Sequence, residues 1–177
     1  ILRQDLIAEF GGSHLNEKEV TAYKPEHAWN YELGARLNSS DGRYRGDVAL
    51  FAIDCRDQQL TVFPEDDLTG RRMTNAGRTR SLGVELSAAA NPVKGLDLDA
   101  AWGFTDARFV EFRSGRDDYS GNRVPYVPRH TLNVGATYSI ELGHKWAERI
   151  EFGVRANGVG SIVWNEAGEY VQPFYTL

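Results

Sequence analysis

The chain has 177 residues and a formal net charge of −5, from 20 Lys and Arg against 25 Asp and Glu. The length suggests a single domain, and the acidic balance argues against a nucleic-acid-binding protein, which usually presents a basic face. The single cysteine, Cys55, excludes an internal disulfide framework and a cysteine zinc cluster. The 18 glycines and the 11% of aromatic residues favour β structure, and no apolar run is long enough for a membrane-spanning helix.

Apolar and polar residues alternate along six segments of the chain. The segments are residues 29–38, 43–53, 81–88, 96–105, 131–140 and 150–157. Alternation places the two kinds of side chain on opposite faces of a strand. We therefore predict six antiparallel strands of roughly 9–12 residues, a length that suits a tilted strand crossing a bilayer. The start of a seventh strand is expected before the end of the chain.

The second segment is irregular. Its apolar set of Tyr44, Val48 and Leu50 is regular, but Phe51 and Ile53 fall on the polar side. A β-bulge explains this irregularity, and so does the end of the membrane-crossing part of the strand. The pattern does not choose between them.

The connections alternate between short and long. Short turns are expected at residues 39–42, 91–95 and 143–145, and long connections at about 54–77, 106–129 and 158–173. This is an up-and-down meander with its large loops at one end, as in outer-membrane barrels. Alternation is also compatible with a soluble β-sandwich or barrel, so strand length and loop asymmetry are what favour the membrane barrel.

Motifs for catalysis are missing from the sequence. The four histidines, His14, His27, His130 and His144, lack metal-ligand spacing, and neither G-x-S-x-G nor a P-loop occurs. The acidic pairs in the long connections lack EF-hand spacing. We therefore expect no enzyme, cofactor or metal site, and we expect Cys55 to be an inert thiol at a strand end.

Four blocks of sequence together resemble the TonB-dependent outer-membrane receptors, of the siderophore-receptor class. The blocks are YKPE…WNYELG (23–34), ALFAID…DQQL (49–60), NAGRTRSLGVEL (75–86) and VPYVPRHTL (124–132). The residues that carry the resemblance are Pro25, Glu26, Asn30, Glu32, Gly34, Asn75, Gly77, Glu85, Pro125 and Pro128. One departure is Cys55, which stands where the family usually has an aromatic residue.

The resemblance implies a barrel of about 22 strands that is closed by an N-terminal plug domain. Such receptors take up ferric siderophores, cobalamin, haem or sugars, driven by the TonB complex of the inner membrane. Residues 1–177 would supply part of the C-terminal half of the barrel, without the plug domain or the terminal strand. The expected partners are outer-membrane lipid, the TonB complex through the plug, and a ferric siderophore or similar ligand. A passive porin-like or adhesin barrel, and a soluble β-sandwich binding module, remain the alternatives.

Particular residues have expected roles. Asn75 and Gly77 would tolerate unusual φ angles where a long loop re-enters a strand. Pro125 and Pro128 would stop strand pairing, and Glu85 would face the lumen. One long connection also carries aromatic and basic residues that could contact an anionic ligand or merely anchor the loop. These residues are Phe109, Phe112, Arg113, Arg116 and Tyr119.

Overall fold

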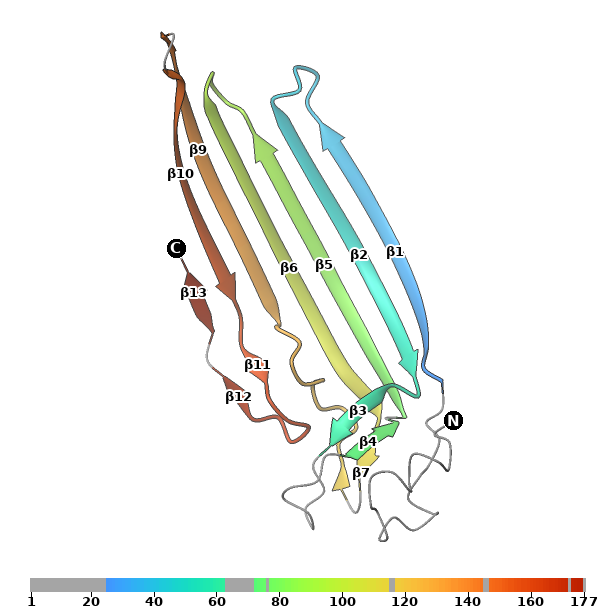
Figure 1. Ribbon diagram of the computed structural model, residues 1–177. Helices are drawn as coiled ribbons and strands as arrows, with labels where there is room; N and C mark the ends of the chain where they lie inside the picture. The colour runs from blue at the N-terminus through green and yellow to red at the C-terminus, as the bar shows by residue number, and fades with distance from the viewer. Residues whose placement is uncertain are drawn as a thin grey trace, which may run out of the picture.

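The computed structural model describes residues 25–62, 72–75, 77–114, 117–144, 147–171 and 173–176. These residues form a seven-stranded antiparallel sheet in the order β1-β2-β5-β6-β9-β10-β13 (Figure 1). The strands are β1 (His27–Asn38), β2 (Tyr44–Arg56), β5 (Arg78–Ala90), β6 (Leu96–Glu111), β9 (His130–His144), β10 (Ala147–Val159) and β13 (Phe174–Thr176). Each long strand pairs with the next one along the chain, so the predicted meander is confirmed.

Short two-stranded sheets occupy the long connections. They pair β3 (Gln59–Val62) with β4 (Arg72–Asn75), β7 (Arg113–Ser114) with β8 (Asp117–Asp118), and β11 (Ile162–Val163) with β12 (Tyr170–Val171). Figure 1 shows these connections at one end of the sheet and the tight turns at the other. The predicted loop asymmetry is therefore present. Among the described residues, no helix could cross a membrane.

The long strands reach or exceed their predicted length. They run from 12 residues in β1 to 16 in β6. In β2 and β6 the extra residues continue the ladder at the loop end, and in β9 they lie at the short-turn end. Strand β6 extends to Glu111 and β2 to Arg56. Alternation fails in these extensions, where charged residues occupy the otherwise apolar face, so the sequence pattern stops short of the hydrogen-bonded strand.

The irregular second segment contains no bulge. Strand β2 keeps an unbroken register with both β1 and β5. Phe51 lies opposite Gly83, and a Cβ atom built on Gly83 would lie 2.1 Å from the Phe51 ring. The ring therefore fills the space that the glycine leaves, which explains an aromatic residue on the polar face.

Gly83→Ala is expected to destabilise the folded protein by roughly 1–3 kcal/mol, because the added methyl group overlaps the Phe51 ring and overpacks the site. Denaturant titration of the protein in detergent measures this change. The matched control is Gly153→Ala on the same face, whose Cβ would meet nothing nearer than the Thr137 hydroxyl at 3.6 Å. Equal stability of the two variants would contradict the packing of Phe51 on Gly83.

The register separates the sheet into an apolar and a polar face. One row of paired residues reads Leu33, Leu50, Val84 and Phe104, and the next row towards the short turns reads Ala35, Val48, Leu86 and Trp102. The apolar face comprises Trp29, Tyr31, Leu33, Leu37, Val48, Leu50, Leu82, Leu86, Leu98, Trp102, Leu132, Val134, Ile150, Phe152 and Val154. The polar face comprises Asn30, Glu32, Arg36, Asp47, Glu85, Ser87, Asp99, Asn133, Glu151 and Arg155.

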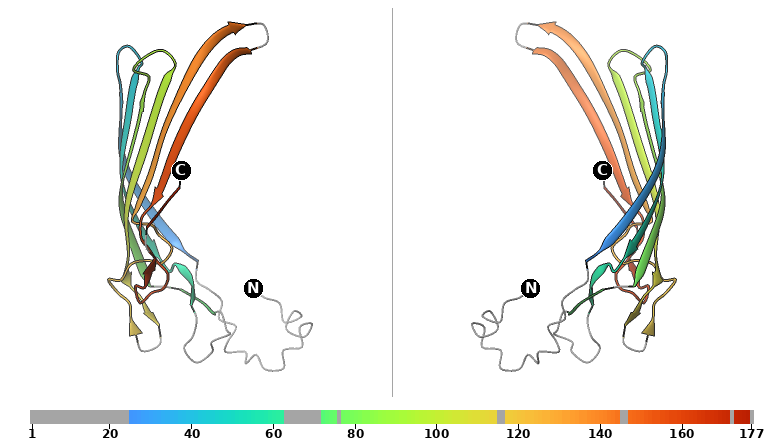
Figure 2. Two further views of the ribbon diagram at one scale, coloured as in Figure 1. Left: turned by 90° about the vertical axis from the view of Figure 1, so that its left-hand side faces the viewer. Right: turned by 90° about the vertical axis from the view of Figure 1, so that its right-hand side faces the viewer.

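Neither face is covered by another layer in the part of the chain that the structure describes. Leu33 is 73% exposed and Val154 is 64% exposed on the apolar face. The buried side chains instead gather at the loop end: Cys55, Thr79, Ala107, Phe109, Phe112, Val124 and Val163. Figure 2 shows that the sheet is curved, with β1 and the β9–β10 hairpin bending towards the same side. The molecule is thus a section of curved wall whose edges are β1 and β13.

Candidate functional site

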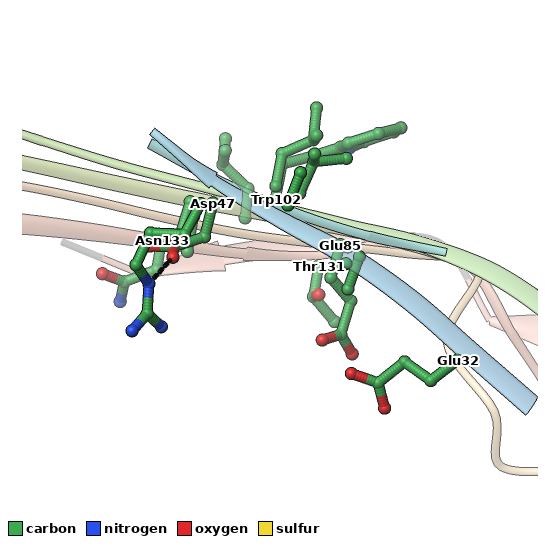
Figure 3. Close-up of a pocket in the computed structure, with 16 residues that line it drawn as sticks. Glu32, Asp47, Glu85, Trp102, Thr131 and Asn133 are labelled. Carbon is green, nitrogen blue, oxygen red and sulfur yellow. Dashed lines mark hydrogen bonds and ion pairs between the residues drawn. The ribbon is translucent and has the colours of Figure 1, made fainter. Parts of the chain in front are cut away.

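A hollow of about 520 Å³ lies on the polar face. Its floor is made of small residues on three strands: Gly34, Ala49, Ala101 and Gly103. Figure 3 shows Glu32, Glu85, Thr131 and Asn133 on one side of the sheet and Trp102 on the other. The hollow forms because the floor residues have little or no side chain, while longer polar side chains stand around them.

Two arginines on this face are paired with carboxylates. Arg36 donates a hydrogen bond to the Asp47 carboxylate, and the Ser87 hydroxyl donates to the same carboxylate at 3.2 Å. Further along the face, Arg155 contacts Asp99 at 3.2 Å. These pairs cross strands, so they fix the side chains without leaving a free positive charge.

Two carboxylates of the hollow are not neutralised in this way. Neither Glu32 nor Glu85 has an ion pair among the residues the structure describes. The hollow therefore presents negative charge above an apolar floor, which suits hydrogen-bond donors or cationic groups of an occupant. No group of three or more His, Cys, Asp or Glu residues in the described segments could hold a metal ion.

The aromatic residues of the 106–129 connection pack on one another. Phe109 and Phe112 are each 1% exposed, with ring centroids 4.7 Å apart, and the Tyr119 ring lies 5.8 Å from that of Phe112. Ala107, Val124 and Val127 complete this cluster. The packing supports the interpretation of the three aromatic residues as loop anchors. Ligand contact by these residues stays a prediction.

The two basic residues predicted beside them are placed differently. The Arg113 guanidinium is exposed and contacts the Asp118 carboxylate at 3.2 Å. Arg116 lies outside the described residues. Of the four predicted loop contacts that the structure describes, Arg113 is thus the exposed one.

Glu26 bridges the end of strand β2 and the segment that follows β2 through hydrogen bonds. Its carboxylate accepts hydrogen bonds from the Cys55 thiol at 3.5 Å and from the Gln59 backbone N–H at 3.3 Å. Burial, followed by the nearby Glu26 carboxylate, raises the pKa of Cys55 to about 11. A thiol with so high a pKa is protonated at neutral pH, which agrees with an inert cysteine.

Neither Asn75 nor Gly77 adopts a positive φ angle in the structure. The left-handed residue at this junction is Asp57, with φ of 54°. The Asn75 side-chain amide donates to the Asp57 carbonyl at 2.6 Å. A Cβ atom on Gly77 would lie 2.6 Å from the carbonyl oxygen of Glu111. Gly77 therefore permits close approach of β6, a use of glycine that the sequence does not distinguish from backbone freedom.

The remaining family-motif residues lie either on the polar face of the sheet or outside the strands. Asn30, Glu32, Gly34 and Glu85 share the polar face. Pro25 is exposed just before β1. Pro125 and Pro128 lie in the connection that precedes β9, outside any strand, as expected for residues that cannot donate to a ladder.

Sequence reasoning missed a group of arginines at the loop end of the apolar face. We call it the arginine band, and it comprises Arg56, Arg78, Arg80, Arg108, Arg123 and Arg129. Arg80 lies in the row of Trp29 and Asp54. Counting parity beyond the apolar stretch of each strand would have found the four that lie in strands, Arg56, Arg78, Arg80 and Arg108.

Comparison with known proteins identifies similar sequences and structures. Residues 5–177 match the family model described as "TonB dependent receptor-like, beta-barrel". The metal-pseudopaline receptor CntO of Pseudomonas aeruginosa is 29% identical over 150 residues, which are 85% of this chain and 20% of that protein. The pesticin receptor of Yersinia enterocolitica is 34% identical over 112 residues, which are 63% of this chain and 16% of that protein.

A solved structure shares the fold. The ferric yersiniabactin uptake receptor FyuA from Yersinia pestis superposes with a TM-score of 0.65 and 25% identity, over 85% of this chain and 21% of that chain. The chain thus spans about a fifth of the length of the relatives it matches.

Proposed function

Since the chain belongs to the TonB-dependent receptor family through its match to the β-barrel model, we propose that it forms part of the barrel wall of an outer-membrane receptor for nutrient uptake. Members of this family are bacterial outer-membrane proteins, and they are receptors and transporters rather than enzymes. Residues 1–177 would belong to the C-terminal part of the barrel domain. The plug domain that closes the barrel would come from another part of the same protein.

The exposed apolar face is the observation that carries this proposal. Its rows of Leu, Val and aromatic side chains have no covering layer in the described structure, whereas soluble proteins rarely expose a large contiguous apolar surface. Lipid tails would cover this face. The polar face would then line the lumen, with the hollow at Glu32 and Glu85 towards the plug.

A ferric siderophore or a similar scarce nutrient is the proposed substrate, and the TonB complex is the proposed source of energy. The names of the relatives support this choice, since they include receptors for metal-pseudopaline and ferric yersiniabactin. Uptake of radioactive iron by iron-starved cells, supplied with a panel of siderophores, tests the substrate class. Flux that persists without TonB would favour the passive porin-like alternative.

The topology can be tested by cysteine labelling in whole cells that express the protein. Asp117→Cys, in the 106–129 connection, should react with a membrane-impermeant maleimide, whereas Lys94→Cys, in a short turn, should not. Both residues are exposed, so accessibility within the protein does not limit either reaction. The native Cys55 is buried and has a pKa raised to about 11, so it should stay silent. Labelling of Lys94→Cys without labelling of Asp117→Cys would show that the short turns, and not the long connections, face the cell exterior.

A further inference from the structure

The arginine band begins with three arginines around one carboxylate. The Asp54 carboxylate contacts the guanidinium groups of Arg78 and Arg80, the latter at 3.3 Å. Arg56 lies 3.8 Å from the same carboxylate. One negative charge cannot neutralise three positive ones, so this part of the band carries an excess of positive charge.

The strand register brings like charges directly opposite each other. Arg56 is the partner of Arg78 across β2 and β5, and Arg80 is the partner of Arg108 across β5 and β6. Arg108 in turn forms an isolated bridge with Arg123. Like charges in directly opposite positions destabilise a sheet. Their recurrence across three strands concentrates positive charge at this end of the wall, which favours the binding of an anion there.

The β6 end of the band contains unsatisfied groups. The Arg108 guanidinium contacts Asp106 at 2.9 Å, but Nε of Arg123 and Oδ1 of Asp106 are buried without a hydrogen-bond partner among the described residues. Arg129 lies over the Phe104 ring at 5.6 Å. With Glu111 also near Arg78, the six arginines face three carboxylates among the residues that the structure describes, which leaves an excess of positive charge in this part of the chain.

The position of the band indicates which anion it meets. A pocket of about 440 Å³ is lined by Trp29, Tyr31, Asp54, Arg56, Arg78 and Arg80. Trp29 and Tyr31 are exposed aromatic residues at the loop end of the apolar face, a place that such residues take at a membrane interface. The arginines lie just beyond them. A lipid with its tails against the apolar rows would therefore bring its headgroup to the arginines.

We propose that the arginine band binds the phosphate groups of an anionic lipid in the leaflet that surrounds the loop end of the barrel. Guanidinium groups bind phosphate through paired, charge-assisted hydrogen bonds, and the aromatic rims of the pocket contact the adjoining part of the lipid. The inference rests on the proposed membrane orientation. It adds a lipid site on the outer wall that is separate from the nutrient path through the lumen.

The test uses the complete outer-membrane protein that contains this chain, purified in a neutral detergent. The probe is a glycolipid with two phosphate monoesters, added to the micelles. We expect it to raise the melting temperature of the protein. Arg56→Gln/Arg80→Gln should weaken this effect at least about tenfold in lipid concentration, which corresponds to the loss of roughly 1.4 kcal/mol. The matched control Arg43→Gln/Arg45→Gln removes two charges near a short turn and should respond like the unmodified protein.

A second measurement separates binding from damage to the fold. Without the glycolipid, the Arg56→Gln/Arg80→Gln protein should be at least as stable as the unmodified protein, because each like-charge pair loses one charge. Equal stabilisation by the dephosphorylated glycolipid, or by inorganic phosphate alone, would overturn the proposal, as would an unchanged response of the double variant. Failure of the proposed membrane orientation is seen independently, as inverted cysteine labelling, and failure of the proposed transport function is seen as loss of TonB-dependent uptake.

Discussion

Leu86→Arg is expected to destabilise the membrane-inserted protein by about 2–4 kcal/mol, the cost of an arginine on the lipid face near the bilayer midplane. Leu86 is 43% exposed on the apolar face, in a row with Val48 and Trp102. It also lies midway along the apolar residues of β5, from Leu82 to Ala90. The neighbouring substitution Ser87→Arg puts the same charge on the polar face, beside the Asp47 carboxylate, and should cost much less.

A third variant distinguishes a lipid-facing surface from a packed interior. Leu86→Trp should be nearly neutral in a bilayer, since lipid tails accommodate a bulky apolar side chain, whereas a close-packed core would lose roughly 1–3 kcal/mol through overpacking. Denaturant titration of the complete protein in lipid vesicles measures all three variants. Loss of stability in Leu86→Trp comparable to that in Leu86→Arg would mean that another protein layer covers this face.

The isolated 177-residue chain is expected to aggregate when it is refolded in buffer without detergent. The described sheet has unpaired backbone edges at β1 and β13, and open edges pair readily with other chains. The apolar face is exposed along its whole length, with Trp29 and Leu33 both more than half accessible. Both features are removed only by barrel closure and by lipid.

Light scattering and size-exclusion chromatography measure this outcome. Detergent or the remaining strands of the barrel should reduce the aggregation, because detergent covers the apolar face and the other strands pair with the open edges. A monodisperse monomer in buffer with a cooperative melting transition would contradict the membrane assignment. It would favour the soluble β-sandwich alternative.

Alternation was sufficient to predict the sheet because lipid and water impose opposite demands on its two faces. Every long strand was found, in the correct order and with the large loops at one end. The prediction of strand length failed at the loop ends, where the strands no longer have one face in lipid and one in water. There Asp54 and Arg80 occupy the apolar side. The strands continue through backbone hydrogen bonds, which the alternation of apolar and polar residues does not predict.

The local site could be predicted less well, because it depends on which residues meet across strands. The polar facing of Glu32 and Glu85 followed from parity alone. The packing of Phe51 on Gly83, and the approach of Gly77 to Glu111, required the register. The burial of Phe109 and Phe112 likewise depends on how the 106–129 connection folds back on itself. Composition shows aromatic residues in this loop, but it does not show which way they turn.

Because Cys55 is buried, its alkylation can serve as a probe of local opening of the sheet. Its thiol lies opposite Thr79 at the seam between β2 and β5, beneath the Glu26 carboxylate. Alkylation requires strands β2 and β5 to separate locally and the thiolate to form. The alkylation rate of the native protein therefore reports how often this end of the sheet opens. Because Cys55 is the only cysteine in the chain, that rate can be followed by mass spectrometry without introducing any label.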